Sequence, residues 1–181
     1  ENWFRKALVG RRRALGEEHR DTLTSWSDLG LAVYRQGDYP AAEREYSQVL
    51  AKQREVFGDD HASTVETMSY LGALRLAQGR SEEAESLFRK VVEKRQVQLG
   101  EDHVSTLMTY GHVGMALRQL GRAPEAEPFY RKAAEGCRRV LGDGHSESLT
   151  AINNLDTLLD GLARHAEAVA CFRKAVAGQR R

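Results

Sequence analysis

The sequence predicts an all-α solenoid of antiparallel helix pairs, and two observations lead to this fold class. A pattern of residues recurs every 42 positions along the 181-residue chain, which is typical of repeat architectures. Within each unit, apolar residues follow one another at steps of three and four, as on one face of a helix. Helices that carry a single apolar stripe bury it only when successive pairs stack. We therefore expect a single repeat array.

Four columns of equivalent residues define the repeat and its boundaries. They are a Leu-Gly-like dipeptide (Leu15-Gly16, Phe57-Gly58, Leu99-Gly100, Leu141-Gly142), a histidine (His19, His61, His103, His145), an alanine (Ala42, Ala84, Ala126, Ala168) and an aromatic residue (Phe4, Tyr46, Phe88, Tyr130, Phe172). They divide the chain into four repeats, 15–56, 57–98, 99–140 and 141–181, after an orphan second helix at 1–14. We expect a fragment of a larger protein, whose exposed array ends could self-associate.

Each repeat is expected to contain two helices. Ser63-Thr64-Val65-Glu66 has the spacing of a capping box, which predicts that the first helix begins near Ser63 and near the equivalent Asp21 and Ser105. A glycine, such as Gly37, is expected to end it. The second helix is expected to begin near Pro40, Glu82, Pro124 and Ala166. The small Gly30 and Ala42 columns allow close helix approach, and the aromatic column fills the adjacent space.

A family resemblance follows from these residues. Trp26-x-x-Leu29-Gly30, followed by Gly37, Ala42 and Tyr46, resembles the tetratricopeptide repeat over essentially the whole chain. The 42-residue period and the Leu-Gly-x-x-His-x-x-Thr-Leu linker are similar to those of kinesin light chains and of many bacterial regulators. The resemblance implies a right-handed superhelix whose first helices line a concave groove. Where kinesin light chains carry asparagines that grip a peptide backbone, this chain has Asp28, Tyr70, His112 and Asn154.

Three positions depart from the repeat pattern. Arg75 occupies a column that is Val33, Leu117 and Leu159 elsewhere. In the last repeat, Asp156 replaces the packing glycine and Ala163 replaces the glycine that ends the first helix. The last repeat is therefore degenerate, as terminal repeats often are.

The side of the first helices opposite the apolar stripe is the predicted partner-binding face. Apolar and aromatic side chains stand there where a solvated surface would be charged, and exposed patches of this kind usually mark binding surfaces. Tyrosine and arginine are also frequent interface hot spots. The predicted partner-binding residues are Leu31, Tyr34, Tyr70, Ala73, Leu76, His112, Met115, Arg118, Asn153, Asn154, Thr157 and Asp160. Alternatively, some of these side chains pack against neighbouring first helices.

The histidine column does not predict a metal site. Equivalent positions on successive helix pairs should lie about 20 Å apart, whereas zinc ligands lie about 2 Å from one ion. We expect these histidines to tie the linker to the next helix start. The two cysteines, Cys137 and Cys171, form neither a disulfide framework nor a zinc pattern. The sequence also contains no phosphate loop, nucleophile elbow or zinc-protease motif, so we expect no enzyme activity and no cofactor.

Composition narrows the function further. There are 27 basic and 26 acidic residues, for a net charge of +1. This balance does not favour nucleic-acid binding, which relies on a surplus of basic charge. No apolar run is long enough to span a bilayer. Basic pairs recur at Arg5-Lys6, Arg89-Lys90, Arg131-Lys132 and Arg173-Lys174, but Glu85 and Glu127 are spaced to neutralise the arginines at 89 and 131. We expect a cytoplasmic protein whose cysteines are reduced. Because arginine outnumbers lysine, we also expect a bacterial source.

The leading hypothesis is therefore a scaffold that binds a protein or a peptide, extended or helical, in its groove. The alternative is a sensor or autoinhibitory arm of a regulatory ATPase or transcription regulator. A third hypothesis is nucleic-acid binding through the basic pairs.

Overall fold

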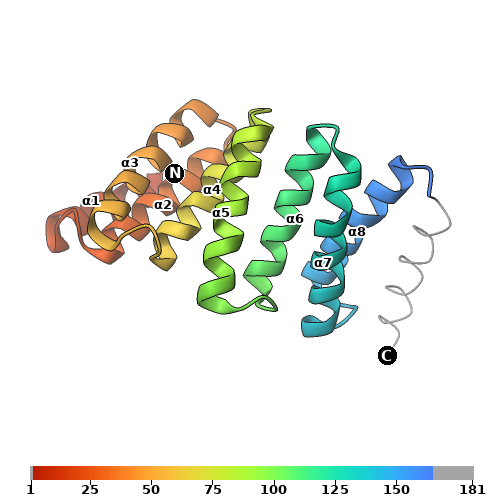
Figure 1. Ribbon diagram of the computed structural model, residues 1–181. Coiled ribbons are helices and arrows are strands. Elements are labelled where there is room, and N and C mark those ends of the chain that lie inside the picture. The colour runs from red at the N-terminus through yellow and green to blue at the C-terminus, as the bar shows by residue number, and fades with distance from the viewer. Residues whose placement is uncertain (1, 165–181) are drawn as a thin grey trace. The chain divides into compact units, whose positions relative to one another are not determined.

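The computed structural model describes residues 2–164, and these residues form eight α-helices and no β-strand (Figure 1). The helices are α1 (Asn2–Leu15), α2 (Arg20–Arg35), α3 (Tyr39–Phe57), α4 (Ala62–Ala77), α5 (Ser81–Leu99), α6 (Val104–Gln119), α7 (Ala123–Leu141) and α8 (Ser146–Gly161). They belong to two compact units, a first unit that ends at Arg80 and a second unit that begins at Ser81. The positions expected at Ala166, Ala168, Cys171, Phe172 and Arg173-Lys174 lie outside the described residues.

The first unit is built by packing helices that follow one another in the chain. Helix α1 packs on α2, α2 on α3 and α3 on α4, and the two first helices α2 and α4 also touch. Tyr46 of α3 is fully buried and passes beside Gly30 of α2, where a Cβ atom would lie 2.7 Å from the tyrosine ring. The close approach that the small and aromatic columns predict is therefore present.

The second unit repeats this arrangement. Helix α5 packs on α6, α6 on α7 and α7 on α8, and the first helices α6 and α8 touch. Tyr130 of α7 is 1% exposed and lies beside Gly114 of α6, where a Cβ would stand 3.0 Å from its ring. The alanines of the small column, Ala42 in the first unit and Ala84 and Ala126 in the second, are fully buried.

The four first helices begin at histidines. His61 takes an extended backbone conformation before α4, and its Nδ1 accepts a hydrogen bond of 3.3 Å from the amide of Ser63. His19, His103 and His145 cap α2, α6 and α8 in the same way. The helix begins at Ala62, within one residue of the predicted start, but the predicted capping box is wrong, because His61 and not Ser63 is the N-cap and satisfies an orphan amide of the first turn. The expected tie between the linker and the helix start is confirmed.

The helix ends behave as the glycine columns predict, with one informative exception. Gly37, Gly79 and Gly121 have φ between 75° and 82°, in the left-handed region. In the fourth repeat Ala163 takes the same place with φ of 58°, and it is the only non-glycine residue with positive φ among the described residues. The backbone keeps the closing turn there despite the steric cost of a Cβ atom.

A chain of ion pairs, missed in the sequence, joins each second helix to the turn of the following repeat. Arg80 pairs with Glu43 at 3.1 Å, Arg122 with Glu85 at 2.8 Å and Arg164 with Glu127 at 2.7 Å. Each pair spans 37 residues of sequence. Arg75 joins this network in the first unit: it is 8% exposed and lies 2.6 Å from the Glu43 carboxylate. The arginine in the apolar column is thus buried with its charge compensated.

The basic pairs of the second helices are also compensated. Arg89 lies 2.9 Å from Glu85, and Arg131 lies 2.8 Å from Glu127, each one helical turn away. These contacts match the ion pairs predicted from the spacing. Within residues 2–164, no helix is both long and apolar enough to cross a membrane.

Candidate partner-binding face

The twelve predicted residues all lie on first helices, on the side that faces away from the buried stripe, and none of them is fully buried. We call this side the partner face. In the first unit it brings together side chains of α2 and α4, and in the second unit side chains of α6 and α8. Half-buried members are Leu31, Tyr34, Tyr70, Ala73, Leu76, His112, Met115 and Asn154; exposed members are Arg118, Asn153, Thr157 and Asp160. The structure therefore leaves these side chains accessible, at least in part.

The first-unit part of this face is made largely of tyrosines. Tyr34 stacks on Tyr39 with ring centroids 5.7 Å apart, and Tyr70 stacks on the buried Tyr46 at 5.9 Å. Tyr70 also donates a hydrogen bond of 2.8 Å to Glu66, one turn earlier on α4. Rings held by stacking lose little freedom when they bind, so this surface is well suited to form an interface.

The two first helices of this unit are joined below the surface by polar contacts. The hydroxyls of Ser27 on α2 and Thr67 on α4 lie 2.9 Å apart, and the amide of the fully buried Gln53 donates to Ser27 at 3.3 Å. These buried hydrogen bonds fix the spacing of α2 and α4, which in turn sets the distance between the tyrosines above them.

The hydroxyl of Tyr46 is an unusual feature of this region. It is buried and has no hydrogen-bond partner among the described residues. Burial raises the pKa of Tyr46, and Tyr70, Tyr34 and Asp28 act in the same direction while Arg35 opposes them. Tyr34 and Tyr70 belong to the partner face, and Asp28 and Arg35 lie on the same helix as Tyr34. The hydroxyl therefore lies directly beneath that face, between α2 and α4.

Equivalent positions in the second unit are occupied differently. Arg118 of the partner face hydrogen-bonds the hydroxyl of Tyr130. Burial raises the pKa of Tyr130, and Arg118 lowers it. Phe88 has no hydroxyl and lies against His112, with ring centroids 5.0 Å apart. Burial lowers the pKa of His112 to about 4, and Arg95 adds to the effect. His112 is thus neutral near pH 7, and its buried Nδ1 has no partner among the described residues.

Two cavities were not anticipated from the sequence. One, of about 280 Å³, lies between α1 and α2 and is lined by Phe4, Asp28, Leu31, Ala32, Arg35 and Gln36. It adjoins the partner face, because Leu31 belongs to both. Exposed aromatic and charged side chains on neighbouring helices were each visible in the sequence, but their convergence depends on the angle at which α1 crosses α2.

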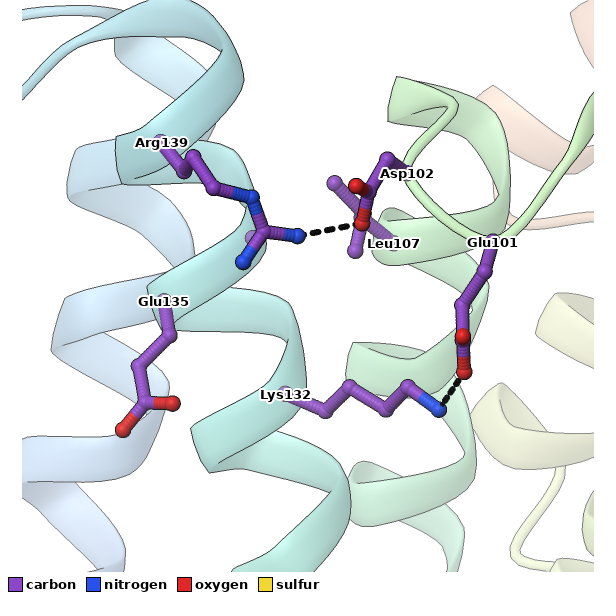
Figure 2. A pocket seen from close by; sticks show the side chains of 7 residues that line it. Glu101, Asp102, Leu107, Lys132, Glu135 and Arg139 are labelled. Carbon is purple, nitrogen blue, oxygen red and sulfur yellow. Dashed lines mark hydrogen bonds and ion pairs between the residues drawn. The ribbon is translucent and has the colours of Figure 1, made fainter.

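The other cavity lies in the second unit, at the start of α6 and along α7 (Figure 2). It measures about 340 Å³ and is lined by Glu101, Asp102, Leu107, Lys132, Glu135, Gly136 and Arg139. Figure 2 shows that its two cations are already paired, Lys132 with Glu101 and Arg139 with Asp102. The carboxylate holds the pKa of Lys132 above its ordinary value. Glu135, the third carboxylate of the lining, has no ion pair or hydrogen bond among the described residues, so the lining carries one more negative than positive charge.

Within residues 2–164, no cluster of three or more histidine, cysteine, aspartate or glutamate side chains is placed to hold a metal ion. The histidine column cannot converge, because each Nδ1 is engaged at its own helix start. The partner face therefore offers tyrosines and aliphatic side chains in the first unit, and Met115 with hydrogen-bonding groups in the second unit.

Comparison with solved structures supports the fold. A kinesin-light-chain-like protein of Podosopora anserina with nearly identical TPR-like repeats matches 97% of this chain and 83% of its own, with a TM-score of 0.80 at 22% identity. BtubC from P. vanneervenii matches 98% of this chain and 74% of its own, with a TM-score of 0.78 at 20% identity. MamA from Desulfovibrio magneticus RS-1 matches 99% and 94%, with a TM-score of 0.66 at 15% identity.

Among the curated proteins compared by sequence, none matches the chain. The family model described as the tetratricopeptide repeat matches it four times in overlapping segments, at residues 1–55, 33–96, 63–135 and 105–181. These segments span the chain, and the helix pairs described above have the architecture that the match requires. The chain belongs to the tetratricopeptide repeat family, whose members generally serve as scaffolds for protein–protein interaction.

Proposed function

We propose that this protein holds a peptide or protein partner on the partner face of its first helices. The observation that carries the proposal is the tyrosine-rich surface of α2 and α4, where Tyr34 and Tyr70 are half-buried and held by stacking. Large rigid aromatic side chains of this kind contribute most of the binding energy in many interfaces. The half-buried Met115 of α6 supplies an adaptable apolar contact in the second unit.

The second helices are less suited to this role. Their charged side chains are largely engaged in ion pairs within the protein: Arg89 pairs with Glu85, and Arg131 pairs with Glu127. A partner would have to break these pairs to use the same charges. In the second unit, α8 instead presents the exposed Asn153, whose side-chain amide can satisfy the backbone of a bound segment.

The test begins with the selection of binders from a displayed random-peptide library against the full chain. The affinity of a selected peptide is then measured by fluorescence anisotropy for the wild type and for the double variant Tyr70→Ala, Met115→Ala. We expect the dissociation constant to rise by about tenfold or more, because two apolar anchors are lost.

A matched control is the double variant Glu93→Ala, Val97→Ala, which alters exposed side chains on α5. It should bind the peptide as the wild type does, and circular dichroism should show that all variants remain helical. If the selected peptides bind both double variants with unchanged affinity, the partner face is not where they bind and the proposal fails.

A further inference from the structure

Helix α1 has an apolar side that no other helix of the first unit covers. Within this unit α1 packs only on α2. The Phe4 side chain is 44% exposed, and Ala7, three residues later on the same side of the helix, is also exposed. Trp3 beside them is 84% exposed. A contiguous apolar surface of this kind usually marks a binding surface.

The repeat shows what covers this side on another second helix of the same unit. Tyr46 and Val49 of α3 stand 42 residues after Phe4 and Ala7, and both are fully buried. The ring of Tyr46 lies against Gly30 of α2. The cover on α3 is therefore a first helix, which brings a glycine against the aromatic ring.

The second unit shows the same cover. Tyr130 and Ala133 of α7 stand in the same two columns and are 1% and 0% exposed. They lie beside Gly114 and Gly111 of α6, where added Cβ atoms would stand 3.0 Å from the tyrosine ring and 3.9 Å from the alanine Cβ. An aromatic ring and a small aliphatic side chain on a second helix are thus buried together by small residues of a first helix.

The column of Trp3 meets the same covering helix. In the second unit it is Phe129, whose ring centroid lies 6.3 Å from that of Tyr110 on α6. In the first unit it is Glu45, which accepts a hydrogen bond of 2.6 Å from the indole of Trp26 on α2. Tyr110 and Trp26 each lie one turn before the glycine that meets the aromatic column. A helix over α1 would likewise set a large side chain against Trp3 and, one turn later, a small residue against the aromatic ring.

The neighbouring part of α2 is open on the same side. Ala32 is half-buried, whereas Leu74 and Ala116 in the same column are fully buried. Ala32 and Phe4 both line the cavity of about 280 Å³ between α1 and α2. The first helices α2 and α4 touch one another, so a helix that covered α1 in the same way would also touch α2 and close this cavity.

We propose that the open side of α1 docks an amphipathic helix of a partner polypeptide, which sets a glycine or alanine against Phe4 and a large side chain against Trp3. The docked helix continues the packing seen between α2 and α3 and between α6 and α7. A second copy that used its own α1 would instead set bulky aromatic rings against one another, with no small residue between them. This is a second surface, since α1 contributes none of the partner-face residues.

A helical peptide tests this docking surface directly. The probe has the sequence of α6 (Val104–Gln119), which carries the small residues, and a hydrocarbon staple on its opposite side keeps it helical. It contains no tryptophan, so the indole signals come only from the two tryptophans of the protein. We expect the Trp3 indole signal of the isotope-labelled full chain to shift saturably in NMR titrations. The same peptide with Gly114→Leu should bind about tenfold more weakly, because the added side chain overlaps the Phe4 ring.

Variants of the protein complete the test. Phe4→Ala should weaken binding of the unaltered peptide by about tenfold, because the aromatic anchor is lost. The matched control is Arg13→Gln, an exposed position on the opposite side of α1, which should leave the affinity unchanged. Circular dichroism should show that both variants remain helical.

Three results would overturn the proposal. One is a Trp3 signal that does not move at peptide concentrations up to about 1 mM. Another is equal affinity for the peptides with and without the Gly114→Leu change, which leaves the protein itself unaltered. The third is a dimer of the chain alone, seen in sedimentation and dissociated by Phe4→Ala, because a second copy would then cover this side of α1.

Discussion

At the scale of single residues, Tyr46 and Tyr130 show how one column can serve two purposes. Both are buried aromatic side chains that pass beside a glycine of a first helix. The Tyr130 hydroxyl is satisfied by Arg118, whereas the Tyr46 hydroxyl has no partner among the described residues. Most buried polar groups in native proteins are hydrogen-bonded, so the Tyr46 hydroxyl is an exception.

This difference predicts opposite effects of the same substitution. Tyr46→Phe removes a hydroxyl without a partner, and we expect the protein to be unchanged or more stable by up to about 1 kcal/mol. Tyr130→Phe removes a hydroxyl that is hydrogen-bonded by Arg118, so we expect a loss of about 1 kcal/mol. Urea unfolding followed by circular dichroism gives both values. Equal destabilisation by the two substitutions would show that the Tyr46 hydroxyl is satisfied in solution.

At the scale of helices, Glu43 of α3 ties α4 and the turn after it to the preceding repeat. Its carboxylate accepts a hydrogen bond of 2.8 Å from Gln78, lies 2.6 Å from Arg75 and pairs with Arg80. These contacts lower the pKa of Glu43 from 4.5 to about 2, with the Gln78 hydrogen bond as the largest cause. Because Arg75 is buried, loss of the carboxylate would leave a desolvated charge.

The pKa of Glu43 sets the pH dependence of this contact. A carboxyl whose pKa is lowered on folding stabilises the protein fully above its unfolded pKa, and this contribution is lost as pH falls from 4.5 through about 2. We therefore expect Glu43→Gln to destabilise the protein by about 1–2 kcal/mol at neutral pH, and the gap from wild type to close toward pH 2. Thermal unfolding across this range measures the gap. The exposed Glu125, paired with Arg122, offers a control, since Glu125→Gln should change little.

At the scale of the whole molecule, charge compensation bears on which polymers the protein can bind. The net charge is +1, and Arg89 and Arg131 are paired with Glu85 and Glu127 on their own helices. Binding to nucleic acid through phosphates requires cations that are free to release counterions. The described second helices hold such charges mainly in internal pairs.

We therefore expect the full chain to leave a heparin column before about 0.2 M salt. The variant Glu85→Gln, Glu127→Gln frees the guanidiniums of its partners and should be retained longer, which shows that the column detects this surface. Retention of the wild type well beyond that salt concentration, with a steep salt dependence of DNA binding, would instead favour a nucleic-acid function.

Much of the fold could be predicted from the sequence, because the apolar and glycine columns repeat at a fixed interval and each interval contains two helical patterns. The helix starts were predicted to within one residue, at Arg20, Ala62 and Val104. The cap was mispredicted: Ser63 has the spacing of a cap, but the N-cap is His61, whose ring nitrogen accepts from the Ser63 amide. Helical periodicity placed the twelve residues on the outward side of the first helices, and their role in binding a partner stays a prediction. The unsatisfied Tyr46 hydroxyl was missed. Whether a side chain of α2 reaches a hydroxyl on α3 depends on how the two helices pack, and no pattern within one helix predicts it.

The ion pairs between glutamate and arginine 37 residues apart allow a repeat to be duplicated or removed while the same contacts are kept. Every pair links a second helix to the turn after the next helix. Duplication or excision of one 42-residue unit would therefore leave each remaining glutamate with an arginine at the same separation. An array of this kind can be lengthened by copying a segment of its gene, without new complementary surfaces having to arise. A longer variant built in this way should keep the connection between repeats and extend only the surface offered to partners.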